Sequence, residues 1–310
     1  MNFRDQNLVN KNKLFFVRHN INFYTDENYT KIDKHRTEQA LTEAWNKNFV
    51  LIDYGEFKDI ETAYNPASYK ISKSAQSCIV RFNNFLTEGG FIVIASSATN
   101  PGQLKAGWVA PNTKPRLIST EINETYCFKG VELTPSSIEI FDISTAPGLF
   151  SAIPRQLTFC EWGSGKRQFE LSYLKIKPSD LKITDFHHRQ LEVLCMEYLR
   201  TFLPDEKNRL SKLMMPIGGS LANVDIVGID VSGNEILAQV TFHEEEAGKI
   251  DKLLSAITSN LSKQIRNGYY FGNIKADHKN NDGICYVNIN EVLDMFVKNE
   301  KSYLYKMLGF

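Results

Sequence analysis

The sequence predicts an α+β or α/β protein of two domains, with a mixed sheet flanked by helices in its C-terminal part. A chain of 310 residues is long for one hydrophobic core and suits two. Two apolar runs, residues 223–229 and 235–242, are joined by the turn Ser232-Gly233-Asn234, a pattern typical of paired strands. Helix-forming segments stand on both sides of this pair, which predicts a sheet covered on two faces.

The N-terminal part begins with helices and strands and continues as a β-rich stretch. The first elements are expected as strands at 14–17 and 49–52 and as helices at 37–47 and 69–88. Short apolar runs between Gly and Pro then predict strands at 91–95, 103–109, 116–118, 125–128, 137–140, 156–162 and 173–176. Strands this short and close together predict a barrel-like part within an N-terminal α+β recognition domain.

The C-terminal part repeats helix and strand in a fixed order. The expected elements are a helix at 184–202, the strand pair, a helix at 247–265, strands at 269–271 and 284–289, and a closing helix from Asn290. The polar joint Lys177-Pro178-Ser179-Asp180 separates this part from the β-rich stretch. We therefore expect one domain over residues 1–177 and a second over 178–310.

Composition sets limits on the function. Hydrophobic residues make up 42% of the chain, no apolar run reaches membrane-spanning length, and the N-terminus lacks the apolar core of a signal peptide, so a cytoplasmic protein without a membrane partner is expected. The five cysteines are scattered without a Cys-x-x-Cys pair, which indicates neither a disulfide frame nor a cysteine zinc site. The formal net charge is zero, whereas nucleic-acid binders usually carry a basic surplus.

Two polar residues interrupt the apolar strand pair. Asp225 opens the first strand between valine and isoleucine, and Gln239 lies within the second. A carboxylate in an apolar strand loses its hydration at a cost unless a partner compensates, and a metal ion is one such partner. The strand pair is therefore a candidate metal site.

The order of elements, together with three short motifs, resembles the PD-(D/E)xK nuclease superfamily, in particular its Mrr-like restriction-endonuclease branch. The matching residues are Glu192 on the first helix, Asp225 in NVDIVGID, and Gln239 in ILAQVTF. The resemblance covers the C-terminal part only. It departs from the family pattern at Thr241, which stands where the family has the lysine of its Q-x-K motif.

The resemblance implies a metal-dependent nuclease that cleaves DNA, in prokaryotic restriction or anti-phage defence. Glu192, Asp225 and the carbonyl of Val240 would hold Mg²⁺ or Mn²⁺, and Gln239 would orient a ligand water. Because Thr241 brings no charge, Lys252 or, as a second choice, Lys249 at the start of the following helix would replace the missing lysine.

Alternatives remain open at each of these points. Asp225 could cap a strand and Glu192 could be a solvated helix residue, with Glu197 and Asp230 as rival carboxylates. The fold could also have lost catalysis and serve as a nucleic-acid-binding module, or as an interaction protein that forms homo-oligomers. In the β-rich part the aromatic residues either stack on a base or belong to the core; these are Trp108, Tyr126, Phe159 and Trp162.

Overall fold

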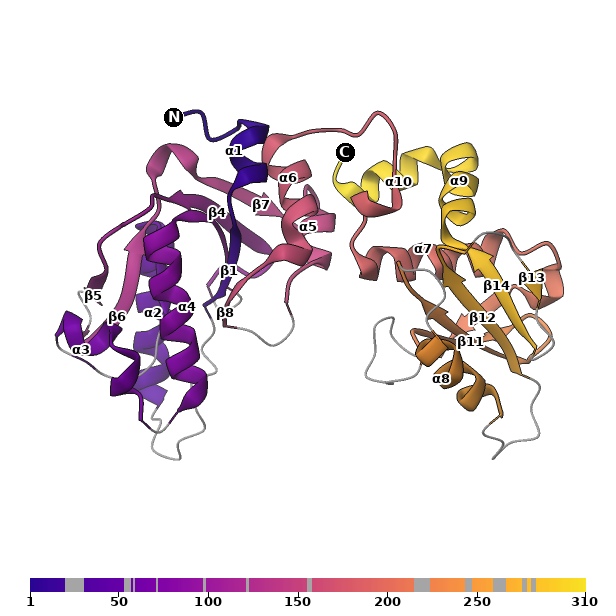
Figure 1. Cartoon of the computed structure of the whole chain (residues 1–310), viewed down its shortest axis with the longest axis horizontal. Helices are drawn as coiled ribbons and strands as arrows, with labels where there is room; N and C mark the ends of the chain where they lie inside the picture. The colour runs from indigo at the N-terminus through magenta and orange to yellow at the C-terminus, as the bar shows by residue number, and fades with distance from the viewer. Residues whose placement is uncertain are drawn as a thin grey trace. The chain divides into compact units, whose positions relative to one another are not determined.

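The computed structural model divides the chain into two compact units, and each is described by itself (Figure 1). The residues described are 1–19, 31–52, 57, 59–70, 72–96, 99–120, 123–154, 158–214, 224–242, 247–258, 266–274, 278–279 and 283–310. Unit 1 comprises Met1–Ala146 and Ile153–Ile176, and unit 2 comprises Pro147–Ala152 and Lys177–Phe310. No helix among the described residues is both long and apolar enough to cross a membrane.

The strands of unit 1 form two sheets. The first has the order β7-β4-β3-β1-β8, with bounds Glu139–Asp142, Gln103–Val109, Gly90–Ala95, Leu14–Arg18 and Phe159–Glu161. The second has the order β2-β6-β5, with bounds Phe49–Ile52, Asn123–Glu132 and Arg116–Thr120. Only the β1–β3 pair is parallel among the described pairings of this unit. The described part of the β-rich stretch is thus divided between two open sheets, and the barrel-like arrangement expected for it is not what these strands form.

Helices cover the strands of unit 1. They are α1 (Gln6–Lys11), α2 (Lys31–Asn46), α3 (Ile60–Tyr64), α4 (Lys73–Glu88) and α6 (Lys166–Leu174). The amphipathic helix α4 buries Ala75, Ile79, Phe82 and Leu86, as its 3- and 4-residue spacing predicts. It begins later than residue 69, because Ser72 caps it by accepting a hydrogen bond from the N–H of Ala75 at 3.2 Å.

Two sequence-based predictions for unit 1 fail for physical reasons. Residues 173–176 are not a strand, since α6 continues to Leu174 and ends where Lys175 adopts a left-handed conformation. The barrel was expected from local strand spacing alone. The sheets are instead completed by strands from the N-terminal segment, because β1 pairs between β3 and β8 and β2 pairs with β6. Such long-range pairing leaves no local pattern in the sequence.

Unit 2 contains a mixed sheet flanked by helices, as predicted. Its helices are α5 (Pro147–Ser151), α7 (His188–Thr201), α8 (Ala247–Thr258), α9 (Ile289–Asn299) and α10 (Lys301–Leu308). Its sheet has the order β13-β14-β12-β11-β10-β9, with bounds His278–Lys279, Ile284–Asn288, Arg266–Gly272, Glu235–Val240, Ile226–Asp230 and Leu210–Leu213. The strands β10 and β11 are antiparallel neighbours inside this sheet, whereas β11, β12 and β14 run parallel.

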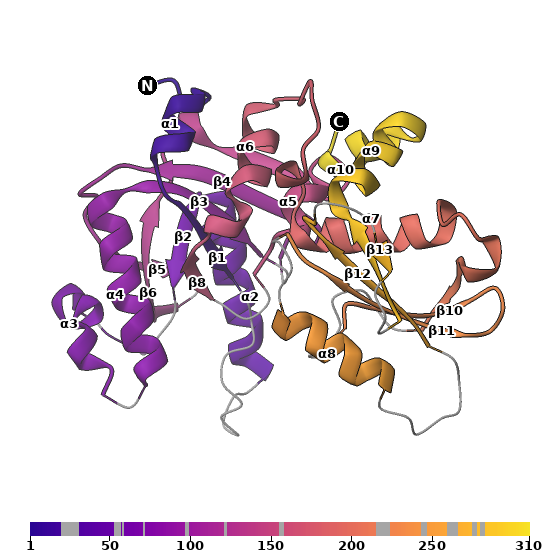
Figure 2. The same ribbon diagram turned by 45° about the vertical axis from the view of Figure 1, so that its right-hand side comes forward.

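The two faces of the sheet in unit 2 are covered by different helices. Leu237 and Tyr270 pack with Leu253 of α8, which runs along β11 and β12 (Figure 2). Neighbouring residues on a strand point to opposite faces. Accordingly Phe271, next to Tyr270, meets Tyr198 of α7 with ring centres 6.0 Å apart. The strand pair therefore lies between α7 and α8.

Local capping fixes the start of α7 and so the position of Glu192. His187 accepts a hydrogen bond at Nδ1 from the N–H of Arg189 at 3.4 Å, and its own N–H donates to the side chain of Gln190 at 3.0 Å. This reciprocal arrangement is a capping box, which satisfies N–H groups that the first helical turn leaves open. The adjacent histidines thus belong to a helix start.

Candidate active site

Asp225 is held in place by the strand that pairs with it. Its N–H donates to the carbonyl of Ala238 at 2.8 Å, which extends the β10–β11 pairing by one residue. Its Oδ2 atom accepts hydrogen bonds from the amide nitrogen of Gln239 and from the N–H of Val240, the latter at 2.8 Å. Within the described part of the chain, all hydrogen bonds to this carboxylate go to Oδ2. The carboxylate is therefore fixed in orientation, with Oδ1 left for another partner.

The surroundings of Asp225 oppose its negative charge. Burial raises the pKa of Asp225, and the N–H of Val240 and the charge of Lys249 offset only part of this effect. The sequence suggested that Gln239 orients a water, whereas its amide nitrogen donates directly to the carboxylate. Gln239 thus positions Asp225.

Glu192 is buried on α7, with 7% of its surface exposed. A solvated helix residue would not be buried in this way, so the alternative reading of Glu192 as a surface group does not fit. Its rival Glu197 is half-buried and lies 3.5 Å from Arg200 in an ion pair one turn along the helix. Glu197 is engaged with Arg200, whereas Glu192 is buried, which makes Glu192 the better candidate ligand of the two.

The thiol of Cys195 is affected by the charges of both candidate carboxylates. It lies one turn after Glu192 on α7 and is completely buried. Burial raises the pKa of its thiol well above the usual range, and the charges of Glu192 and Asp225 raise it further. The charges of both candidate carboxylates thus act on the same buried thiol. Sequence reasoning treated Cys195 only as a small apolar residue, although its position one turn from Glu192 was visible.

The basic residues of α8 differ in their relation to Asp225. Lys252 is exposed, whereas Lys249 is half-buried and its charge acts on the carboxylate of Asp225. The next residue, Ile250, packs in one apolar cluster with Val224, the neighbour of Asp225. This packing places the start of α8 beside the start of β10. The structure thus favours Lys249, the second choice from the sequence, as the lysine nearer the site.

The other rival carboxylate, Asp230, has a structural role. Its two carboxylate oxygens accept from the N–H of Asn234 at 2.8 Å, from the Asn234 side chain at 3.1 Å and from the Asn267 side chain at 3.1 Å. These bonds close the turn between β10 and β11 and tie it to β12. Asp230 is therefore fully engaged in holding the hairpin.

The donor atoms of the site suit a hard divalent cation. Among the described residues, no three His, Cys, Asp or Glu side chains are grouped as a metal-binding set. The candidate set consists of two carboxylates, Glu192 and Asp225, with the main-chain carbonyl of Val240. Mg²⁺ accepts a few protein oxygens and keeps several waters, so an oxygen set of this size fits it.

In unit 1 the aromatic residues belong to the core. Trp108, Phe159 and Trp162 are each at most 4% exposed, and Trp162 meets Phe16 edge to face. The side chain of Tyr126 lies outside the described residues. A base cannot stack on rings that are already enclosed, so a base-stacking pocket does not exist at these three residues.

Comparison with known proteins leaves the family open. No family model and no curated protein matches the chain. Among solved structures, a complex of EndoMS with double-stranded DNA aligns with 63% of this chain and 71% of that chain, at 11% identity and a TM-score of 0.22. A match at this TM-score and identity does not establish a shared fold.

Proposed function

We propose that unit 2 is a nuclease domain that cleaves DNA with Mg²⁺ or Mn²⁺. The observation that carries this proposal is the half-buried carboxylate of Asp225 at the start of β10, which Gln239 and Val240 hold in a fixed orientation. The order of elements in unit 2 and the positions of Glu192, Asp225 and Gln239 resemble the Mrr-like branch of the PD-(D/E)xK nucleases. That resemblance supports prokaryotic restriction or anti-phage defence as the setting.

The residues divide the work as follows. Glu192, Asp225 and the carbonyl of Val240 would hold the metal ion, and Gln239 fixes the orientation of Asp225. When bound, a divalent metal activates water and stabilises charge that develops on the phosphate. The charge of Lys249 acts on Asp225, whereas the lysine of the family pattern would stand at the position of Thr241. We propose that Lys249 stabilises the anionic transition state in place of that lysine.

A second function has an observation in its favour. Thr241 is buried, and its N–H donates to the carbonyl of Phe271 at 2.9 Å. A neutral residue, Thr241, therefore occupies the position of the family lysine and is hydrogen-bonded into the sheet. A unit that has lost catalysis and only binds nucleic acid would look the same at this position.

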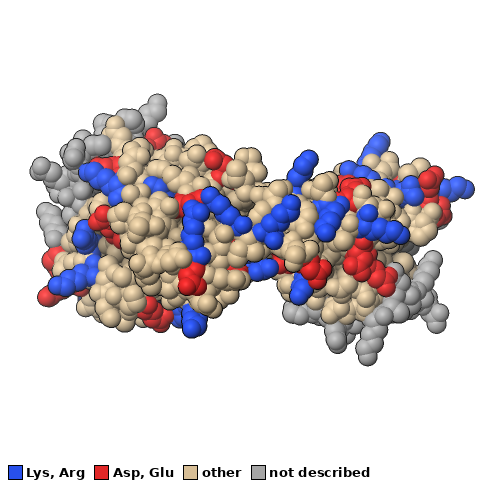
Figure 3. All heavy atoms as spheres, turned by 90° about the horizontal axis from the view of Figure 1, so that it is seen from above, with Lys and Arg blue, Asp and Glu red and all other residues tan. Residues whose placement is uncertain are grey.

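The surface charge does not decide between the two functions. Lys and Arg side chains lie interspersed with Asp and Glu over the face drawn in Figure 3, in agreement with the zero net charge. Any contact with DNA on that face would therefore rest on a few local cations, and weak salt dependence of binding is expected.

Cleavage assays on the wild type and the Thr241→Lys variant separate the two functions. The proposal expects the wild type to cut DNA with Mg²⁺ or Mn²⁺ and to stop when the metal is chelated. If the wild type binds DNA without cutting it and Thr241→Lys restores cutting, the domain is a catalytically degenerate binding module. Binding measured on the same samples shows that both proteins are folded and engage DNA.

A further inference from the structure

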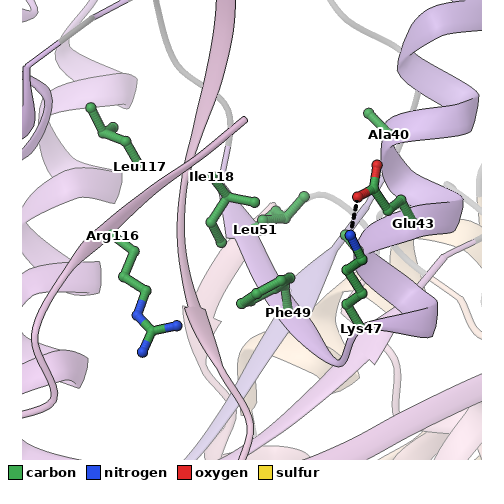
Figure 4. Close-up of a pocket in the computed structure, with 9 residues that line it drawn as sticks. Ala40, Glu43, Lys47, Phe49, Leu51, Arg116, Leu117 and Ile118 are labelled. Atoms are coloured by element: carbon green, nitrogen blue, oxygen red, sulfur yellow. Dashed lines mark hydrogen bonds and ion pairs between the residues drawn. The ribbon is translucent and has the colours of Figure 1, made fainter. Parts of the chain in front are cut away.

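Unit 1 contains a pocket between α2 and the sheet β2-β6-β5 (Figure 4). Its volume is about 240 Å³. One wall is the last turns of α2, with Ala40 and Ala44, and Lys47 just beyond the end of the helix; the facing surface comes from β2 and β5. The pocket lies far along the chain from the candidate active site.

The space exists because the helix presents small side chains. Ala40 and Ala44 are four residues apart and so lie on the same side of α2, and both are buried. Across from them Leu51 and Ile118 form the floor with a glycine between them, since a Cβ on Gly130 would stand 2.6 Å from Ile118 and 2.8 Å from Leu51. Because these two residues of α2 are alanines, the pocket stays open between the helix and the sheet, whereas larger side chains at the same positions would fill it.

Phe49 and two cations stand at the mouth of the pocket. The ring of Phe49 is half-buried, and Figure 4 shows it between the side chains of Arg116 and Lys47. Lys47 lies 2.5 Å from Glu43, and Arg116 lies 3.4 Å from Glu132. Both basic side chains are more than half exposed, and Glu43 is the one acid among the lining residues.

These features select the kind of ligand. An apolar floor with a partly exposed aromatic ring binds a flat, apolar group, and the two exposed basic side chains at the mouth can bind an adjacent anion by exchanging their ion pairs with Glu43 and Glu132. Pockets for whole drug-sized ligands measure about 300–1,000 Å³, so this smaller one suits a single base-sized ring system. Arginine suits a phosphate, because its planar guanidinium donates two parallel hydrogen bonds.

We propose that the pocket between α2, β2 and β5 binds an unpaired nucleobase, with the adjacent phosphate held by Arg116 and Lys47. Preference for a nucleotide over other anionic aromatic ligands rests on the proposed function of unit 2. Unit 1 then supplies recognition of single-stranded or extruded bases, separate from the site around Asp225.

The experiment measures binding to the full chain by calorimetry, with adenosine 5′-monophosphate, a twelve-nucleotide single strand and inorganic phosphate as probes. The wild type is expected to bind the nucleotide, the strand or both, and to bind phosphate alone at least tenfold more weakly. Binding of the nucleotide identifies a free nucleotide as ligand, and binding of the strand alone identifies a base within a chain. Equal affinity for phosphate, or no binding of either nucleic-acid probe, overturns the proposal.

Variants place the binding in the pocket. Arg116→Gln should weaken nucleotide or strand binding at least fivefold, whereas the matched control Lys114→Gln, an exposed residue two positions earlier that does not line the pocket, should leave it unchanged. Ala44→Leu should fill the pocket and abolish binding. If Arg116→Gln and Lys114→Gln weaken binding equally, the contact is general electrostatics and the proposal fails, whether or not Ala44→Leu folds.

Cleavage assays on the same proteins separate this proposal from the function of unit 2. If the pocket binds nucleotides while the wild type cuts no DNA, the proposed nuclease fails and the pocket stands. If the wild type cuts DNA while Arg116→Gln changes no affinity, the pocket fails and the nuclease stands.

Discussion

The main-chain N–H of Val240 donates a hydrogen bond of 2.8 Å to Oδ2 of Asp225, across two antiparallel strands. The position of this carboxylate thus depends on the pairing of β10 with β11 as well as on its own rotamer. The Gln239 amide reinforces the same oxygen. A site built in this way holds one ligand oxygen rigidly before any metal binds, which favours precise placement of the reacting groups.

Substitutions of Asp225 should separate charge from hydrogen bonding. Asp225→Asn keeps an oxygen for the Val240 N–H and removes a half-buried charge, so the free energy of unfolding should stay within about 1 kcal/mol of the wild type or increase. Asp225→Ala leaves two donors without this acceptor and should cost about 1–3 kcal/mol. Urea unfolding measures both. If both variants lose the same large amount of unfolding free energy, the carboxylate charge itself stabilises the fold.

Gln239→Met should lower activity more than stability. Methionine is similar in length but cannot donate to Asp225, so the carboxylate gains rotational freedom and the cleavage rate should fall at least tenfold. Calorimetric titration with Mn²⁺ should show weaker metal binding in the same variant. Unchanged cleavage and unchanged metal affinity would mean that the amide contributes nothing to the site beyond packing.

Lys249 and Lys252 should differ in their effect on cleavage. Lys249→Ala removes the cation whose charge acts on Asp225, and the rate should fall at least tenfold, about 1.4 kcal/mol of barrier. Lys252→Ala serves as the matched control, since it removes the same charge from an exposed position on the same helix. The reverse order of effects would favour Lys252, the first choice from the sequence. If both variants cleave DNA at the wild-type rate, no lysine of α8 takes part in the reaction.

His19 should make unit 1 sensitive to acid. It is buried at the end of β1, where its Nε2 accepts a hydrogen bond of 3.0 Å from the N–H of Leu51. Burial, together with the nearby charge of Lys105, lowers the pKa of His19 from 6.5 to about 4. The folded protein therefore keeps this ring neutral at pH values where the unfolded chain protonates it.

The sign of the effect follows from proton binding. Between pH 4 and 6.5 the unfolded chain binds a proton that the folded chain does not, so this contribution is complete above about pH 6.5 and is lost as the pH falls to 4. The loss should amount to about 3 kcal/mol. His19→Gln keeps an acceptor for Leu51 and does not titrate, so urea unfolding from pH 7 to 4.5 should lose less stability in the variant. An identical slope in both proteins would contradict this assignment.

The fold of unit 2 was predictable because its pattern is local. The apolar runs flanking Ser232-Gly233-Asn234 gave the β10–β11 pair, and the periodic apolar residues around Leu194 and Leu253 gave α7 and α8. In unit 1 the pairing of β1 between β3 and β8 joins segments far apart in the sequence, and no local spacing records it. The barrel-like expectation failed for that reason, whereas the strand at 173–176 failed because helix α6 continues to Leu174.

The site was predictable in its residue types but not in its contacts. An acid in an apolar strand marked Asp225, yet the sequence did not show that the Gln239 amide would donate to it. The choice between Lys249 and Lys252 depends on how α8 lies against β10, which helical periodicity leaves undetermined. Cys195 gained significance only when α7 and the strand pair were placed together.

The measurement that tests the central claim most directly is metal-dependent DNA cleavage by the wild type, Glu192→Gln and Asp225→Asn at equal protein concentration. The two variants remove one candidate ligand charge each and nearly preserve side-chain shape, and circular dichroism checks their fold. We predict that the wild type cuts DNA with Mg²⁺ or Mn²⁺ and that each variant is at least a hundredfold slower. A wild type that cuts no DNA with either metal, or variants that cut at its rate, would contradict the account.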